Sequence, residues 1–245
     1  MAHRILLAGA SGAIGMRLAP LLRDAGHQVA GTTRSAAKTD ALRALGVEPI
    51  VVDVYDAPAL SRFAAAFRPD IVINQLTDLP KDMDPAKMGD AVHRNARVRD
   101  EGTRNLVNAA IAAGARRMIA QSILWTFAPG PEPHAESDPL EADAEGNRGI
   151  SVRGAIALET LTLNSPPLAG VVLRYGQLYG PGTHADKPAN QAPVHVDAAA
   201  YAALLAVDRG KPGIYNVAQP NKYARTDKGR AELGWDADFR LVANT

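Results

Sequence analysis

Three glycines near the N-terminus have a spacing that suits phosphate binding. The segment reads Gly9-Ala-Ser-Gly12-Ala-Ile-Gly15, and it lies between the apolar run 4–8 and a helical pattern over residues 14–24. Glycines in such a turn reverse the chain tightly and let backbone N–H groups approach a pyrophosphate, whose charge the helix N-terminus also favours. The sequence therefore predicts a dinucleotide-binding turn. Its predicted cofactor-binding residues are Gly9, Ser11, Gly12, Ala13, Ile14 and Gly15.

The end of the second expected strand indicates which dinucleotide binds. Residues 27–31 are followed by Thr-Thr-Arg34, with no acid at this point. A carboxylate here would bind the adenosine ribose diol, whereas an arginine can pair with a 2′-phosphate. We therefore predict NADP rather than NAD as the cofactor, with Arg34 as the anchor; the alternative is a solvated arginine in a loop. The predicted helpers of this arginine are Thr33, Ser35 and Lys38.

The third expected strand, 48–53, closes with Asp53-Val54. This position could place a carboxylate near the adenine amino group, so Asp53 and Val54 complete the predicted cofactor site. An aspartate at a strand end is also common in any protein, which is the structural alternative.

Short runs rich in Ile and Val alternate along the chain with longer segments of helical period. This alternation predicts parallel strands joined by crossover helices, and the right-handedness of each crossover leaves few other topologies. The predicted fold is α/β, a Rossmann-type doubly wound parallel sheet. The expected strands are 4–8, 27–31, 48–53, 70–74, 117–121, 170–174 and 213–217. The expected helices are 14–24, 36–45 with Ser35 as its cap, 58–67, 93–113, 152–163 and 197–207.

The second half of the chain is less regular. Prolines, glycines and acids over residues 128–149 predict a surface loop, and residues 183–193 are polar and without periodicity. We predict a dinucleotide-binding Rossmann domain over residues 1–165. Residues 166–245 are then expected to supply the remaining strand or strands and a small C-terminal substrate lobe.

Composition excludes several classes of function. The 245 residues are 47% hydrophobic and carry a net charge of +1, so nothing in the charge balance favours nucleic acid or an anionic membrane as a partner. The absence of cysteine excludes disulfides, thiolate metal ligands and thiol nucleophiles, and no metal site is predicted. The apolar stretch at the N-terminus is too short for a signal peptide or a membrane span, so we expect a cytoplasmic protein.

Further landmarks follow in order along the chain. They are Glu101-Gly-Thr-Arg-Asn-Leu-Val-Asn-Ala-Ala110, Leu173-Arg-Tyr-Gly-Gln-Leu-Tyr-Gly-Pro-Gly182, Val194-His-Val-Asp197 and Glu232-Leu-Gly-Trp235. With the glycine turn and Asp53-Val54, they make the chain resemble the extended short-chain dehydrogenase/reductases, nearest to the NAD-dependent epimerase/dehydratase-like group. The resemblance runs nearly end to end. It implies a seven-stranded or similar Rossmann sheet and chemistry that begins with hydride transfer at a carbonyl or carbinol carbon.

The chain departs from this family at its proton relay. The family uses a Tyr-x-x-x-Lys pair, in which the lysine lowers the pKa of a phenol beside the substrate oxygen. Counting back from Glu159, which resembles the acid one turn after that lysine, the tyrosine position falls on Ser151 and the lysine position on Ala155. Neither side chain can act as the acid or base.

Two other family positions have also changed. The serine or threonine at the end of the fifth strand falls at Ile123, with Ser122 one residue earlier, and the helix asparagine is Arg99 here. The candidate catalytic residues that remain are Ser122, Tyr179 and His195, with His134 a weaker one. Each has a structural alternative: Tyr179 packed under the glycine-proline turn, His195 as a hydrogen-bonded structural histidine, and His134 in solvent.

The expected substrate is small. Only twelve residues separate Gly182 from His195, whereas enzymes of this family that hold nucleotide sugars usually place a longer run there. Helix residues Val98, Leu106 and Ala110, with the helix 152–163, could form the dimer face that this superfamily often uses, or could pack on the sheet. The first of these alternatives predicts a homodimer, which a sedimentation experiment would test.

Three functions remain open from the sequence. The first is an NADP-dependent oxidoreductase or epimerase-like enzyme that acts by hydride transfer on a small carbonyl or hydroxyl substrate without the usual Tyr-x-x-x-Lys pair. The second is a catalytically inactive NADP(H)-binding redox sensor or regulatory protein. The third is an interaction subunit that keeps the fold without using the cofactor, which the retained glycine turn and Arg34 disfavour.

Overall fold

The computed structural model describes residues 1–80, 83–189 and 191–242. Seven strands form one parallel sheet in the order β3-β2-β1-β4-β5-β6-β9, which confirms the predicted Rossmann-type architecture. The strands are β1 (Arg4–Ala8), β2 (Gln28–Thr33), β3 (Glu48–Val51), β4 (Ile71–Asn74), β5 (Arg117–Ile123), β6 (Ala169–Tyr175) and β9 (Gly213–Val217).

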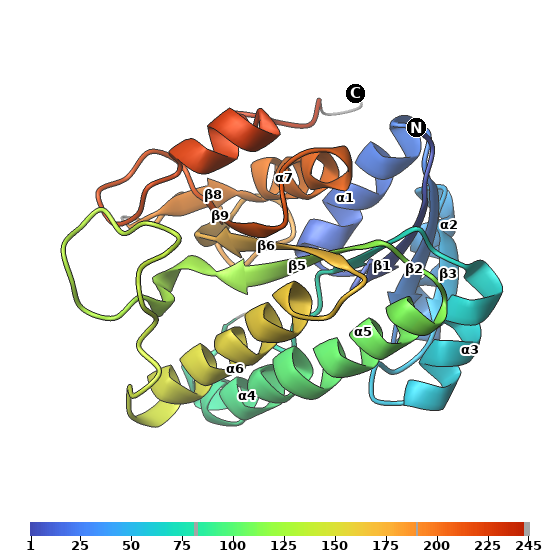
Figure 1. The fold of residues 1–245 in the computed structure, drawn as a ribbon, viewed down its shortest axis with the longest axis horizontal. Coiled ribbons are helices and arrows are strands. Elements are labelled where there is room, and N and C mark those ends of the chain that lie inside the picture. The colour runs from blue at the N-terminus through green and yellow to red at the C-terminus, as the bar shows by residue number, and fades with distance from the viewer. Residues whose placement is uncertain (81–82, 190, 243–245) are drawn as a thin grey trace.

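Helices cover both faces of the sheet (Figure 1). One layer contains α1 (Ala13–Asp24), α2 (Thr39–Ala44) and α7 (Val196–Asp208). The opposite layer contains α3 (Ala57–Phe67), α4 (Pro85–Arg97), α5 (Thr103–Ala112) and α6 (Gly146–Leu163). Because both faces are covered, the central strands are buried on both sides and read as continuous apolar runs.

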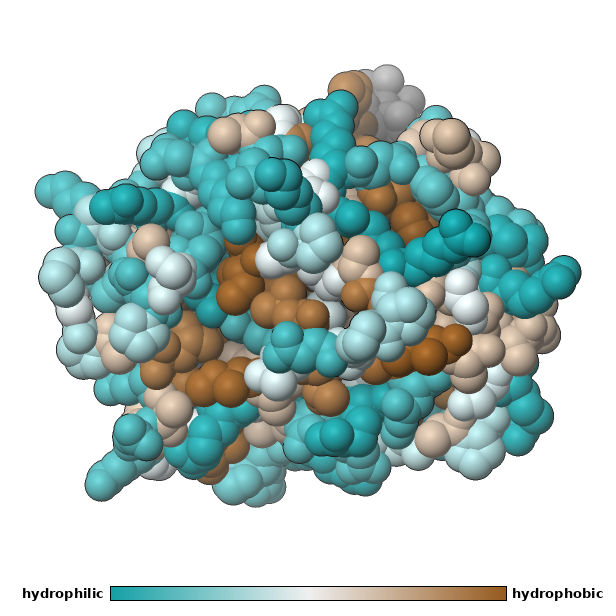
Figure 2. All heavy atoms as spheres, in the orientation of Figure 1, coloured by the Kyte–Doolittle hydropathy of each residue, from teal (hydrophilic) through white to brown (hydrophobic). Residues whose placement is uncertain are grey.

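Strand alternation divides the core into two parts. In β1, Ile5 and Leu7 pack toward α1 and α7, whereas Leu6 and Ala8 pack toward α3 and α5. Figure 2 shows apolar side chains gathered toward the centre of one face of the molecule, with hydrophilic residues around its margin. Among the described residues, no helix has the length and apolarity that crossing a membrane requires.

The helix expected over 93–113 is wrong in its extent. It begins earlier, with α4 at Pro85, and it passes through the π-helix η2 (Val98–Gly102) before α5. The first turns of α4 were missed because they are polar and lack an apolar period. Val98, Leu106 and Ala110 are buried between these helices and the sheet, so they pack on the sheet rather than forming an exposed face.

The helix expected after Ser35 is also different. Ser35 makes no side-chain cap, and a short 3-10 helix, η1 (Ala36–Lys38), precedes α2. The Ser35 amide instead donates to Thr33 Oγ1 at 3.2 Å, so the turn at the end of β2 is held by a threonine hydroxyl.

Beyond residue 165 the chain both completes the sheet and builds a smaller unit. β6 and β9 extend the main sheet, and β7 (Gln177–Tyr179) and β8 (Pro193–His195) pair parallel in a separate two-stranded sheet. Two short 3-10 and π segments, η3 (Leu124–Thr126) and η4 (Gly229–Leu233), complete the elements. Strands of three residues, bordered by Gly and Pro, carry too little periodicity to be predicted.

Candidate functional site

A pocket of about 730 Å³ opens at the carboxyl ends of the central strands. Its walls come from the β1–α1 turn, the ends of β2, β4 and β5, and the loop that follows β7. The chain continues from β1 to β2 on one side, whereas β4 adjoins β1 on the other side, so the strand order reverses here. Ligands of open α/β sheets bind in the crevice at such a reversal.

The glycine turn has the geometry that the sequence predicted. Gly9 has φ +80°, a backbone conformation that favours glycine, and the Gly12 amide donates to the Gly9 carbonyl at 3.0 Å. A Cβ on Gly15 would lie 2.3 Å from the Gly9 oxygen, so this position excludes any side chain. Gly9 and Gly12 line the pocket, whereas Gly15 lies behind them and packs the helix against the turn.

The N-terminus of α1 faces this pocket. Gly12, Ala13 and Ile14 line it, and the first turn of the helix contains no acid. The unpaired N–H groups and the positive end of the helix dipole suit a pyrophosphate at this point. The turn and the helix therefore fit the phosphates of a dinucleotide.

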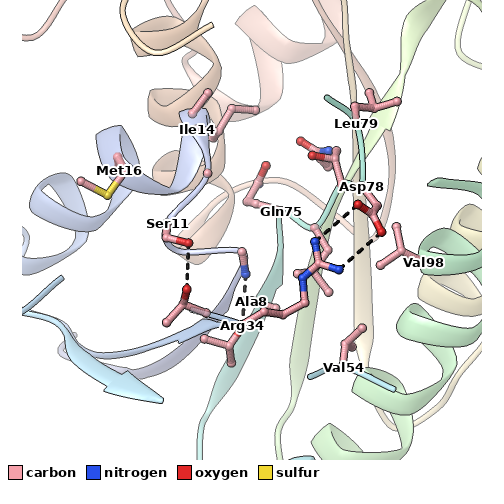
Figure 3. Close-up of a pocket in the computed structure, with 18 of the residues that line it drawn as sticks. Ala8, Ser11, Ile14, Met16, Arg34, Val54, Gln75, Asp78, Leu79 and Val98 are labelled. Atoms are coloured by element: carbon pink, nitrogen blue, oxygen red, sulfur yellow. Dashed lines mark hydrogen bonds and ion pairs between the residues drawn. The ribbon is translucent and has the colours of Figure 1, made fainter. Parts of the chain in front are cut away.

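Arg34, which follows β2, lines the same pocket and points toward Asp78 (Figure 3). Its two terminal nitrogens each donate to a carboxylate oxygen of Asp78 at 3.4 Å, and Arg94 lies 3.9 Å from the same carboxylate. The hydrogen bond to Asp78 raises the pKa of Arg34, and burial opposes this only in part. Among the described residues that line the pocket, Asp78 is the only acid.

The predicted helpers of Arg34 surround it. Thr33, Ser35 and Lys38 all line the pocket, and the Ser11 hydroxyl lies 3.1 Å from that of Thr33. The structure therefore brings the glycine turn and the end of β2 into one cavity.

The Asp53-Val54 pair divides between two environments. Val54 lines the pocket, where Leu60, Val98 and Leu106 join it in an apolar wall that suits a purine ring. Asp53 is exposed and does not line the pocket; its carboxylate accepts a hydrogen bond from the Tyr55 amide at 3.0 Å.

Ser122 points to the opposite side of the sheet, toward α6. Its hydroxyl is buried and donates to Glu159 at 2.7 Å, and Arg174 donates to both oxygens of that carboxylate at 2.9 and 2.7 Å. Ser122 is not among the residues that line the pocket. Its catalytic role stays a prediction.

Tyr179 and His195 face each other across the small sheet. They are register partners of β7 and β8, with ring centroids 5.1 Å apart. The Tyr179 hydroxyl donates to Gln219 and accepts from Arg240, and His195 Nδ1 accepts from the Asp197 amide. Burial, and then Arg240, lower the pKa of His195, which favours the neutral ring. Neither residue lines the pocket, so their catalytic roles also stay predictions.

His134 is not in solvent, as its structural alternative expected. The ring is buried, stacks on Phe127 at 4.7 Å between centroids, and its Nδ1 lies 3.2 Å from Asp138. The loop that carries His134 folds back onto the C-terminal region, where the His134 amide donates to the Tyr223 carbonyl. This packing gives His134 a structural role.

A buried arginine occupies the region where the family's proton relay would act. Ser151 and Ala155 lie one turn apart on α6, and Arg99 from η2 donates to the Ser151 carbonyl at 3.5 Å. Burial lowers the pKa of Arg99 to about 10, so the guanidinium stays charged at neutral pH. A cation therefore reaches this part of α6 from the neighbouring helix rather than from a lysine on α6 itself.

Several residues of the pocket were not predicted from the sequence. They are Arg17, Gln75, Asp78, Gln121 and His184. A usable signal existed for two of them: Gln75 directly follows the buried strand β4, and Asp78 comes three residues later, at the edge where ligands of parallel sheets bind.

The sequence profile of the NAD dependent epimerase/dehydratase family matches residues 5–212. The chain belongs to this family. It is 45% identical over 183 residues to the 3-diazoavenalumate denitrifying reductase of a Streptomyces species, a match that covers 74% of this chain. The chain spans 58% of the length of that reductase.

Solved structures agree with the fold. UDP-glucose 4-epimerase of Thermotoga maritima, solved with UDP-glucose, has a TM-score of 0.77 at 17% identity, with 97% of this chain and 94% of that chain covered. The Bordetella bronchiseptica enzyme WbmG, solved in complex with NAD, has a TM-score of 0.74 at 20% identity, with 98% and 91% covered. At these identities the likeness concerns the fold.

Proposed function

We propose that this protein is an NADPH-dependent reductase that transfers a hydride to a small electrophile. The observation that carries the proposal is the single pocket in which the glycine turn of β1–α1 and Arg34 of the β2 end lie together. The turn suits the pyrophosphate, and the apolar wall beside Val54 suits the adenine. Arg34, with Lys38 nearby, offers cations to a 2′-phosphate.

The preference for NADPH over NADH rests on charge. Arg34 and Lys38 line the adenosine end of the pocket, and the one acid among its described lining residues, Asp78, is already paired with Arg34. The family name and the solved relatives refer to NAD. This chain differs by having an arginine after β2, and we therefore assign it the phosphorylated cofactor.

The missing proton relay narrows the substrate class. Reduction of a carbonyl leaves an alkoxide that an acid must protonate, and such acid catalysis is worth roughly 10²–10⁴-fold in rate. Ser151 and Ala155 supply no such acid, and Ala155 is fully buried. An acceptor that needs no proton from the protein suits this site better.

A diazonium group meets this requirement, and the reductase relative is named for a diazo compound and for denitrification. When bound, NADPH supplies a hydride. A new N–H bond to the terminal nitrogen of an aryl diazonium ion gives a neutral aryl diazene. This diazene breaks its C–N bond and releases N₂, and the hydrogen ends on the ring carbon. The overall reaction takes up no proton from the protein. No acid is therefore required at the positions of Ser151 and Ala155.

The test is NADPH consumption with a panel of acceptors. We expect the enzyme to turn over small aryl diazonium ions with release of N₂. Turnover of aldehydes, ketones and UDP-glucose should be much slower. The Gly12→Val variant, which should not bind NADPH, measures the uncatalysed reaction. Faster turnover of carbonyl compounds than of diazonium ions would contradict the proposed substrate class.

The retained alternative is an NADP(H)-binding sensor. The same observation, that Ser151 and Ala155 replace the acid and its lysine, favours it. Tight NADPH binding without consumption by any member of the panel would support the sensor over the reductase.

A further inference from the structure

Two glutamines lie side by side in the deep part of the pocket. Gln75 directly follows β4, and Gln121 belongs to β5. Asn74 and Ala120 are register partners, so Gln75 and Gln121, each one residue further along, lie next to each other. Both line the pocket, and their exposed fractions are only 5% and 9%. Figure 3 shows Gln75 between α1 and the segment that carries Asp78.

The two side chains share one face of the sheet. Ile119, two residues before Gln121, packs in the core under α1 and α7, and side chains two apart on a strand point the same way. Ile73, two residues before Gln75, packs in the same core. Ser122 points to the other face, where it meets Glu159.

The carboxamide of Gln75 is unpaired. Neither its nitrogen nor its oxygen has a hydrogen-bond partner among the described residues, although both atoms are buried. Tyr175 is close to Gln75: burial raises the pKa of Tyr175, the Gln75 side chain opposes this in part, and the Tyr175 hydroxyl donates its proton to the Ala199 carbonyl at 3.1 Å. Buried amides are nearly always hydrogen-bonded, because leaving them unpaired costs free energy. A ligand that offers both a donor and an acceptor would remove this cost.

The position of Gln75 indicates which part of a ligand reaches it. Arg34 and Lys38 line the pocket near the end of β2, and the backbone of Gln75 lies against the glycine turn, where a Cβ on Gly9 would be 2.7 Å from the Gln75 carbonyl oxygen. A dinucleotide with its adenosine phosphate at Arg34 and its pyrophosphate at the glycine turn would bring its other base to the remaining polar residues of the pocket, Gln75 and Gln121. The carboxamide of a nicotinamide ring has one acceptor oxygen and one NH₂ donor, which complement the amide of a glutamine.

We propose that Gln75, with Gln121 beside it, hydrogen-bonds the carboxamide of the nicotinamide and so fixes the orientation of the ring. This inference rests on the proposed binding of NADPH. Gln75 is a positioning residue: it performs no proton transfer, but it determines which face of the ring is presented to an acceptor. The Gln75 amide is unpaired in the ligand-free protein. Replacing Gln75 with an apolar side chain should therefore stabilise the ligand-free protein and weaken the binding of the cofactor.

The test compares two ligands that differ by the nicotinamide. Gln75→Met, which keeps the volume and removes the amide, should weaken NADPH about five- to ten-fold, the value of one neutral hydrogen bond. The same variant should bind 2′-phospho-ADP-ribose as the wild type does, since that ligand lacks the nicotinamide. The ligand-free variant should also melt at a higher temperature than the wild type. Gln177→Met, an exposed glutamine of β7, is the matched control and should change none of these values.

A second measurement needs no variant. The 3-acetylpyridine analogue of NADPH replaces the NH₂ donor with a methyl group, so the wild type should bind it several-fold more weakly than NADPH, and Gln75→Met should lose this discrimination. Equal loss of NADPH and 2′-phospho-ADP-ribose, or no loss of either, would overturn the assignment of Gln75. Failure of the wild type to bind both ligands would overturn the proposed function itself, which separates the two outcomes.

Discussion

Arg34 and Asp78 form an ion pair in the pocket, and this pairing bears on the proposed choice of cofactor. Arg34 is more than half exposed, so solvent screens the pair and its contribution to stability is small. Its effect on a ligand is larger, because a 2′-phosphate must share the guanidinium with a carboxylate. If NADPH binds as proposed, Asp78 should oppose the binding of the 2′-phosphate.

Asp78→Asn tests this role. The change removes the competing charge and keeps the side-chain volume, so NADPH affinity should rise about three- to ten-fold, on the order of 1 kcal/mol. NADH affinity should stay within about two-fold. Fluorescence titration of both cofactors measures the effect. A fall in NADH affinity would instead mean that Asp78 binds the ribose diol, which would contradict the assignment.

Sequence reasoning identified Arg34 and missed Asp78 and Gln75 for a physical reason. Arg34 directly follows β2, a strand that can be recognised from the local sequence, so its position at the edge of the sheet could be predicted. Asp78 and Gln75 reach the pocket because β4 lies beside β1 in the sheet, a pairing between residues far apart in the sequence. The charge partner of Arg34 is therefore a property of the tertiary structure.

At the scale of elements, the β1–α1 turn combines two different requirements for glycine. A Cβ on Gly12 would lie 3.3 Å from the Gly9 oxygen, a tight contact that small shifts relieve, whereas a Cβ on Gly15 would lie 2.3 Å from the same atom. Gly15 is therefore required for the contact between helix and turn, whereas Gly12 lines the pocket, where we propose that a side chain would obstruct the ligand.

Gly12→Val should keep the fold and lose the cofactor. The branched side chain occupies the space into which the pyrophosphate must fit, so NADPH affinity should fall by at least about ten-fold while circular dichroism stays native. Gly15→Val is the comparison and should fail to fold. A folded Gly12→Val protein with unchanged NADPH affinity would place the cofactor elsewhere.

The layer formed by η2, α6 and β6 encloses two arginines and one glutamate. Arg99, Arg174 and Glu159 are all buried, and Arg174 is held at 2.7 Å by the carboxylate. These three side chains together carry a net charge of one positive unit in the protein interior. Glu159 forms the ion pair with Arg174, and its charge also acts on Arg99.

Glu159→Gln should destabilise the protein strongly. It leaves the buried guanidinium of Arg174 without its ion-pair partner and removes the charge of Glu159 that acts on Arg99, and breaking one side of a buried pair costs about 3–5 kcal/mol. Urea unfolding measures the loss, with Glu145→Gln, an exposed acid at the start of α6, as the control that should stay within about 0.5 kcal/mol. A loss below about 1 kcal/mol would show that Arg99 and Arg174 do not depend on this carboxylate.

Most elements could be predicted because their apolar residues have a clear period. The strands of the main sheet are short apolar runs, and the helices α1 and α3 have one apolar face. The start of α4 and the helix after Ser35 could not be predicted, because α4 begins with polar turns and a threonine hydroxyl replaces the expected cap. The pocket's glycine turn was predictable, whereas the surroundings of Ser122, Tyr179 and His195 depend on packing between distant segments.

For the whole molecule, fold and family are established and the remaining step is from family to reaction. The strand order reverses beside β1, and there the structure gathers the glycine turn, Arg34 and Gln75 in one pocket. Ser122, Tyr179 and His195 lie outside its lining, whereas His184 lines it, so an acceptor that needs no proton relay stays a proposal that the acceptor panel tests. The proposed reaction and the proposed role of Gln75 both depend on NADPH occupying the pocket.

The measurement that tests this most directly is a paired titration of NADPH and NADH with the wild type and Arg34→Ala. One charge-assisted pair is worth roughly 1.5–3 kcal/mol, and about 1.4 kcal/mol is a factor of ten. We therefore expect NADPH to bind at least about ten-fold more tightly than NADH to the wild type. Arg34→Ala should remove this preference and leave NADH affinity unchanged. Equal affinities in the wild type, or NADPH binding that Arg34→Ala leaves untouched, would contradict the account.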